Sequence, residues 1–202
     1  EGASQKRFSP GKDALDFYLA FSDKTGTVYS WDQSMPYSID AFVEGKAAMM
    51  INYPHHISVI ASKAPYLNFA TAQVPQLRDR SEDVNYASYW GLTVSKNSLN
   101  TPVAWKFVDF LLQPENVKKY LDNTKLPTAR RDLILHQQQD QMLRPFANQI
   151  LSARSWYMGD SGATEAVVLD MIKSAQVGER TIEEVLEDAA ARVTVILQKI
   201  KE

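Results

Sequence analysis

The sequence predicts an α/β protein in which helices outnumber short strands. Apolar residues recur at spacings of three and four in several segments, most clearly over 182–200, as in amphipathic helices. Short apolar runs bounded by glycine and proline, such as Ala47–Ile51, are typical of buried strands. The 202 residues contain no repeat and no low-complexity segment, and a chain of this size folding alone would bury about 70% of its unfolded surface.

The first elements are two helices. Ser9 can cap a helix over about 10–23, with Pro10 in its first turn, where the missing N–H costs nothing. The run Thr25-Gly26-Thr27 ends it. A shorter helix over 38–44 follows, and Gly45 is expected to end that helix in the left-handed conformation.

Three strands and one more helix are predicted next. The strands are expected at Ala47–Ile51, at Asn68–Val74 and at Tyr86–Val94, the last interrupted at Gly91, and a helix is expected from Pro54 to about Ala61. A charged loop over 78–83 separates the second strand from the third. Strands alternating with helices favour the α/β class.

The second half of the chain is predicted to be helical. The helix from Thr101 to Leu112 has almost no polar face, which predicts burial on most sides. Further helices are expected over 114–123, 142–151 and 164–176. The last helix begins with Thr181-Ile182-Glu183-Glu184, which matches a capping box.

The composition excludes several classes of protein. Lys and Arg total 22 against 24 Asp and Glu, a formal charge of −2, whereas nucleic-acid binding normally requires clustered positive charge. No apolar run approaches the roughly 20 residues that span a bilayer. There is no cysteine, so the chain has no disulfide framework, no thiolate nucleophile and no cysteine zinc site.

No motif demands catalysis, a metal or a cofactor. His55 and His56 are adjacent, and on a helix their side chains would point apart, which disfavours a shared metal ion. Gly159-Asp160-Ser161-Gly162 superficially matches the nucleophile loop of trypsin-like proteases, but the rest of that machinery is missing and a turn is the better interpretation. No phosphate-binding glycine loop occurs. The sequence thus predicts a protein that is not an enzyme.

Large aromatic residues lie beside loops and predicted strand ends. An aromatic ring can stack on the apolar face of a sugar while polar neighbours bind its hydroxyl groups. Such residues also fill protein cores, so both interpretations remain open for each residue. The set consists of Trp31, Tyr53, Tyr89, Trp90, Trp156 and Tyr157.

Several segments, in order, resemble one family over nearly the whole chain. They include SIDAFVEGKAAMMIN at 38–52, FATAQVP at 69–75, GLTVSKNS at 91–98, LPTARR at 126–131 and GERTIEEVL at 178–186. This order resembles the extracellular solute-binding proteins of sugar ABC importers, the maltodextrin-binding-protein-like group. The resemblance is to the carboxyl-terminal half of that family.

The resemblance implies a periplasmic binding protein type II-like fold, of which this chain would be the carboxyl-terminal portion. Residues 1–77 and 131–202 would belong to the second of two α/β lobes, and residues 86–128 would return to the first, with the hinge crossed near Pro75 and Pro127. It implies a periplasmic or extracellular protein, with a possible lipid anchor upstream. The implied function is to bind a carbohydrate between the lobes and deliver it to the membrane permease without chemical conversion.

Residue by residue, the resemblance points to the turn after the 47–51 segment, where relatives commonly place an aromatic residue against the sugar. Here Tyr53 or His55 would take that role. Tyr89 and Trp90 would border the cleft, together with Trp156 and Tyr157.

Two further expectations follow. The competing class is a helical protein–protein interaction module that uses the terminal helix, 181–201, as its partner face. If the chain is half of a two-lobed protein, its 101–112 helix lacks the lobe it packs into. We therefore expect the chain to pair with a missing amino-terminal half, to self-associate through this region, or to have been trimmed from a longer chain. Full burial of Trp105, Phe107 and Phe110 within this chain would contradict that expectation.

Overall fold

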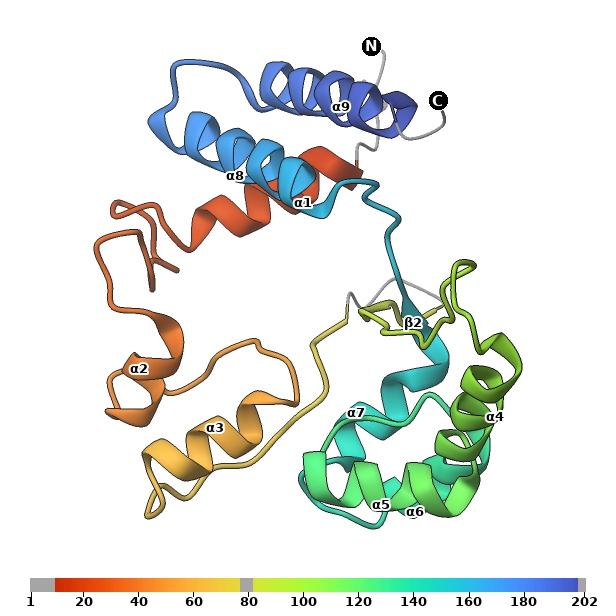
Figure 1. Ribbon diagram of the computed structural model, residues 1–202. Coiled ribbons are helices and arrows are strands. Elements are labelled where there is room, and N and C mark those ends of the chain that lie inside the picture. The colour runs from red at the N-terminus through yellow and green to blue at the C-terminus, as the bar shows by residue number, and fades with distance from the viewer. Residues whose placement is uncertain (1–9, 77–81, 200–202) are drawn as a thin grey trace. The chain divides into compact units, whose positions relative to one another are not determined.

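The computed structural model describes residues 10–76 and 82–199, which form two compact units. Unit 1 contains the described residues of 1–36 and 157–202, and unit 2 contains those of 37–156. The predicted cap Ser9, most of the charged loop at 78–83 and Lys201 lie outside the described residues. Figure 1 traces the helices, which dominate the structure, in chain order.

Unit 1 consists of three packed helices. Helix α1 spans Pro10–Ala20, α8 spans Ser161–Val177 and α9 spans Ile182–Lys199, and each contacts the other two, as Figure 1 shows for α8 and α9. Their packing buries an apolar stripe from each helix, in keeping with the spacing of apolar residues in the sequence. The core residues are Leu15, Thr164, Val167, Val185 and Ala189.

Local interactions define where α8 begins and ends and where α9 begins. The predicted capping box is confirmed: the Thr181 N–H donates to Glu184 Oε2 at 2.8 Å, and the Glu184 N–H donates to Thr181 Oγ1 at 3.2 Å. Gly178 ends α8 with φ +75°, a conformation that glycine adopts without strain. Asp160 caps α8 by accepting from the Ala163 N–H at 3.0 Å, so the Gly159–Gly162 segment is a helix-initiating turn.

The loop between α1 and unit 2 is organised around Asp32. Its Oδ1 accepts from the Ser34 hydroxyl and the Ser34 N–H, at 2.5 and 2.8 Å. Its Oδ2 lies 2.9 Å from Lys24 Nζ and accepts from the Tyr29 hydroxyl at 3.0 Å, and the side chain is only 12% exposed. The Ser34 hydroxyl, Lys24, the Ser34 N–H and the Tyr29 hydroxyl together hold the pKa of Asp32 well below its usual range.

We expect Asp32→Asn to destabilise unit 1 at neutral pH and to matter less in acid. A carboxylate with a depressed pKa stabilises the fold above its unfolded pKa of about 3.9, and that contribution is lost as the pH falls toward the folded value. Urea unfolding of both proteins between about pH 7 and 2 measures it. A stability difference that does not change with pH would contradict this role of Asp32.

Unit 2 contains short helices and one small sheet. Its elements are α2 (Ser38–Val43), α3 (His56–Lys63), β1 (Asn85–Tyr86), α4 (Thr101–Leu111), α5 (Pro114–Thr124), η1 (Arg131–Leu133), α6 (Ile134–Gln137), α7 (Arg144–Gln149), η2 (Ile150–Ser152) and β2 (Ala153–Arg154). Strands β1 and β2 pair in parallel, Asn85 opposite Ala153 and Tyr86 opposite Arg154. The Thr71 hydroxyl donates to the Met142 carbonyl at 2.7 Å, which ties the chain after α3 to the segment before α7.

Most of the predicted helices are confirmed, with small shifts of their ends. The helix expected from Pro54 begins at His56, and the one expected over 142–151 divides into α7 and η2. The helix expected from Thr164 already begins at Ser161. Gly45 ends the second helix with φ +72°, as predicted.

The predicted strands at Ala47–Ile51 and Asn68–Val74 are wrong. Of the strand predicted at Tyr86–Val94 only Tyr86 is in a strand, as the second residue of β1. Met49 and Ile51 are largely exposed. A strand forms only when a neighbouring strand takes its backbone hydrogen bonds, and within residues 10–76 and 82–199 only β1 and β2 pair. The fold is therefore helix-rich with few strands, as expected, but the sheet is much smaller.

Helix α4 is also more exposed than predicted. Of its apolar side chains only Val108 is buried, whereas Trp105, Phe107 and Phe110 are exposed. An all-round apolar helix predicts burial only if the surrounding elements are present, and unit 2 packs against one side of α4. In the part of the chain that the structure describes, the full burial of these three rings that would contradict the expectation of a missing partner is not observed.

Candidate functional site

The aromatic residues predicted to bind a ligand fall in both units. Trp31 and Tyr157 belong to unit 1, and the other five, Tyr53, His55, Tyr89, Trp90 and Trp156, belong to unit 2. Each group is described within its own unit.

The turn before α3 brings its aromatic rings together. The rings of Tyr53 and His55 stack with centroids 5.9 Å apart and planes 14° from parallel, and the His55 and His56 rings are 4.0 Å apart. Asn52 Oδ1 accepts from the Tyr53 N–H at 2.8 Å, and the Tyr53 carbonyl accepts from the His56 N–H at 3.1 Å. These bonds fold the turn so that the Tyr53 ring lies alongside that of His55.

The prediction that His55 and His56 point apart is therefore wrong. His55 precedes the first residue of α3, so the two residues are not successive positions within a helix. The Nδ1 atom of His56 is buried without a hydrogen-bond partner, and burial together with the neighbouring His55 lowers the pKa of His56. A lowered pKa keeps this imidazole neutral near pH 7.

A second aromatic group follows the two strands. Because β1 and β2 are parallel, their carboxyl ends meet at the same edge of the pair, where open α/β sheets place ligands. Tyr89 and Trp90 follow β1, and Trp156 follows β2. All three side chains are exposed, Trp90 completely, and we call them the aromatic edge.

In unit 1, Trp31 is half-buried beside the Asp32 loop. Its backbone N–H donates to the Phe21 carbonyl at 3.1 Å, which fixes the loop against the end of α1. Tyr157 is exposed at the start of the segment that leads to α8.

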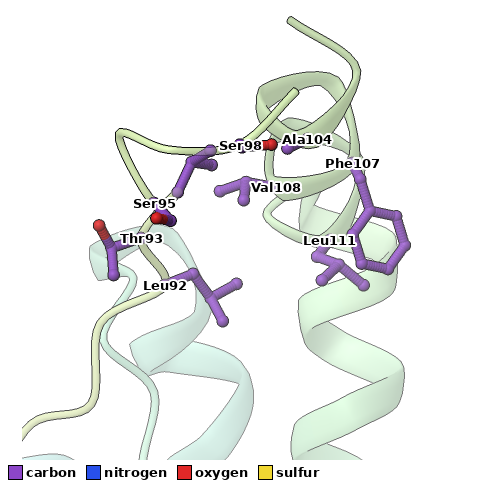
Figure 2. A pocket seen from close by; sticks show the side chains of 9 residues that line it. Leu92, Thr93, Ser95, Ser98, Ala104, Phe107, Val108 and Leu111 are labelled. Carbon is purple, nitrogen blue, oxygen red and sulfur yellow. The ribbon is translucent and has the colours of Figure 1, made fainter. Parts of the chain in front are cut away.

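Sequence reasoning missed an apolar groove on α4. It has a volume of about 360 Å³, and Figure 2 shows the segment from Leu92 to Ser98 facing the side chains of α4. The lining residues are Leu92, Thr93, Val94, Ser95, Ser98, Ala104, Phe107, Val108 and Leu111. The available signal was the all-round apolar character of 101–112, which predicted burial instead of a groove.

The two aromatic groups offer exposed rings that a ligand could contact. Within the described residues, no three His, Asp or Glu side chains gather closely enough to hold a metal ion. None of the helices in that same part of the chain is long and apolar enough to cross a membrane. Stacked and exposed aromatic rings can receive the apolar face of a ligand.

Comparison with known proteins identifies the class. Residues 1–142 match the family model described as bacterial extracellular solute-binding protein, so the chain belongs to this family. Proteins of the family generally bind solutes for transport instead of converting them, and they act in the periplasm or outside the cell.

Three individual proteins are distantly similar to the chain. Provisionally named binding proteins from Brucella abortus strain 2308, Brucella abortus biovar 1 strain 9-941 and Brucella suis biovar 1 strain 1330 are each 27% identical over 171 residues. The alignments cover 78% of this chain and 39% of each relative. The chain thus matches less than half the length of these relatives.

Proposed function

We propose that this chain is part of the carbohydrate-binding component of an ABC importer, which delivers its solute to the permease subunits in the membrane. The aromatic edge is the main support: Trp90 and Trp156 follow neighbouring parallel strands at the edge where such folds bind ligands. The stacked pair of Tyr53 and His55 offers a second aromatic surface in the same unit.

The proposal includes an arrangement of the chain into two lobes. The chain would be the carboxyl-terminal portion of a type II periplasmic binding protein, with residues 1–77 and 131–202 in one lobe and 86–128 in the other. Trp31 and Tyr157, which lie in unit 1, stay part of the proposal as ligand-binding residues. The protein would work in the periplasm or at the cell surface, where a lipid anchor would keep it near the permease.

Isothermal titration of the complete protein against a panel of mono- and oligosaccharides, polyols, amino acids and peptides tests the proposal. Binding of one carbohydrate with displacement by close analogues is the expected result. Binding of peptides or amino acids without any carbohydrate would refute the substrate class but not membership of the solute-binding family.

The exposed face of α4 supports a proposal about partners. Its groove and the neighbouring side chains of Trp105, Phe107 and Phe110 form an apolar surface of the kind that isolated domains avoid. We propose that the amino-terminal half of the complete protein covers it, because the relatives are more than twice as long as the stretch that matches.

Phe107→Asp should weaken that association, because the side chain lines the groove and a buried charge is costly. Sedimentation of the chain with and without a separately produced amino-terminal half measures it. A wild-type chain that dimerises by itself, with Phe107→Asp monomeric, would show that a second copy is the occupant instead.

The alternative class, a helical interaction module, finds less support. The apolar stripe of α9 is already used within unit 1, where Val185 and Ala189 are buried against α1 and α8. A partner would have to displace contacts that hold the three helices together.

A further inference from the structure

Side-chain amides join three separate stretches of chain next to β1 and β2. Asn85 Oδ1 accepts from Gln149 Nε2 at 2.6 Å and from Gln76 Nε2 at 3.3 Å. Asn85 Nδ2 donates to Ser152 Oγ at 2.8 Å. We call these four residues the Asn85 clasp, because Asn85, with only 9% of its surface exposed, is the member that bonds to the other three.

The outer members of the clasp are tied to the backbone in turn. The Ser152 hydroxyl donates to the Gln149 carbonyl at 3.1 Å. Gln76 donates to the Val74 carbonyl at 3.0 Å, and its Oε1 accepts from the Val84 N–H at 3.0 Å. The clasp therefore fixes the main chain at 74–76, at 84–85 and at 149–152, and not only four side chains.

The strands themselves are too short to fix their register. Each has two residues, and the Ala87 N–H adds a bond to the Arg154 carbonyl at 3.0 Å. A slip by one residue would turn every side chain of one strand to the opposite face. The bond from Asn85 to Ser152, the residue just before β2, opposes such a slip because Asn85 pairs with Ala153 in the observed register.

The aromatic edge depends on this register. Trp90 lies a few residues beyond Asn85 on one stretch, and Trp156 lies a few residues beyond Ser152 on the other. The Trp90 side chain is completely exposed and that of Trp156 is about half exposed, so packing of the rings does not by itself fix their separation. The distance between the two rings therefore depends on how the stretches that carry them, after β1 and after β2, are aligned with each other.

We propose that Asn85 is a positioning residue, which holds the segments carrying Trp90 and Trp156 in the one register where both can contact the same ligand. Its effect on affinity rests on the proposed carbohydrate-binding function. Its effect on the strand pair does not, because the hydrogen bonds of the clasp form within the chain itself.

Asn85→Leu is the test variant, because leucine has a similar volume but removes the acceptor of the Gln149 amide and the donor to Ser152 Oγ. Gln149→Ala removes one bond of the clasp and serves if Asn85→Leu does not fold. Gln137→Leu is the matched control. Gln137 is a buried amide of the same unit that accepts from the Thr128 N–H at 2.8 Å and donates to the Leu126 carbonyl at 2.7 Å, away from the strands.

Two measurements on the complete protein test whether Asn85 has this positioning role. Hydrogen exchange of the Ala87 amide should become about tenfold faster in Asn85→Leu and stay unchanged in Gln137→Leu, although both variants melt earlier. The dissociation constant for the carbohydrate found by titration should rise about tenfold in Asn85→Leu alone.

Unchanged exchange at Ala87 would overturn the proposal, and so would faster exchange with undiminished carbohydrate affinity. Equal effects from Gln137→Leu would show a general loss of stability, which also overturns it. If the wild-type protein binds no carbohydrate, the proposed function fails while the clasp is judged by Ala87 exchange alone: faster exchange in the variant supports it and unchanged exchange refutes it.

Discussion

Replacing Leu15 with alanine is expected to lower the free energy of unfolding of unit 1 by about 2–5 kcal/mol. Leu15 lies in the middle of α1, and only 5% of its surface is exposed in the three-helix packing. Truncation removes buried methyl groups and leaves a cavity that α8 and α9 can fill only partly.

The loss of stability should be large because unit 1 buries few large apolar side chains. Two of the other core positions, Thr164 and Ala189, carry small side chains, so Leu15 supplies a large share of the buried apolar surface. Helix α1 is also held by Lys12, whose Nζ lies 2.9 Å from Glu183 Oε1, but an exposed ion pair of this kind contributes little.

Urea denaturation followed by far-ultraviolet circular dichroism measures the change, with Leu169→Ala as the matched control. Leu169 lies on α8 in the same unit and is 50% exposed, so its truncation should alter stability by less than about 0.5 kcal/mol. Similar losses from both substitutions would contradict the assignment of Leu15 to the core.

Replacing Trp90 or Trp156 with alanine is expected to weaken carbohydrate binding on the order of tenfold to a hundredfold. An indole ring that covers the apolar face of a sugar contributes through its buried area and through stacking, and both are lost in alanine. Trp90 is completely exposed, so Trp90→Ala should leave the free energy of unfolding nearly unchanged. Trp156 is 49% exposed, so Trp156→Ala is expected to lower the free energy of unfolding as well, because it removes the buried half of the ring.

Titration calorimetry with the carbohydrate identified in the test of the proposed function is the measurement, and Trp105→Ala is the control. Trp105 lies on α4, in the same unit but outside the aromatic edge. Full affinity in both edge variants, or an equal loss in Trp105→Ala, would remove the aromatic edge from the proposed binding site.

Part of the candidate site could be predicted from the sequence. The turn with Tyr53 and His55 can be recognised from the sequence, although the stacking of the two rings is not predicted. Trp90 is predicted within a strand, whereas the structure places it after β1 with its side chain exposed. The contact between His55 and His56 could not be predicted, because it depends on where α3 begins. The Asn85 clasp could not be predicted either, since its members come from three distant stretches.

By itself, the sequence determined the helices of this protein and most of their ends. Apolar spacing, the capping box at Thr181 and the glycines at 45 and 178 act within a few residues, so they can be recognised without knowing what lies elsewhere. The membership of a solute-binding family likewise followed from the order of its segments.

Only the tertiary structure decided which apolar runs are strands and which apolar surfaces are buried. The run Ala47–Ile51 has the composition of a strand but no strand beside it in the described residues, whereas Asn85 and Tyr86 pair with Ala153 and Arg154. Strand pairing and burial are properties of two segments at once, and the partner segment can lie anywhere along the chain. The same holds for α4. Its apolar sequence indicates that the helix packs against another surface, but not which surface that is.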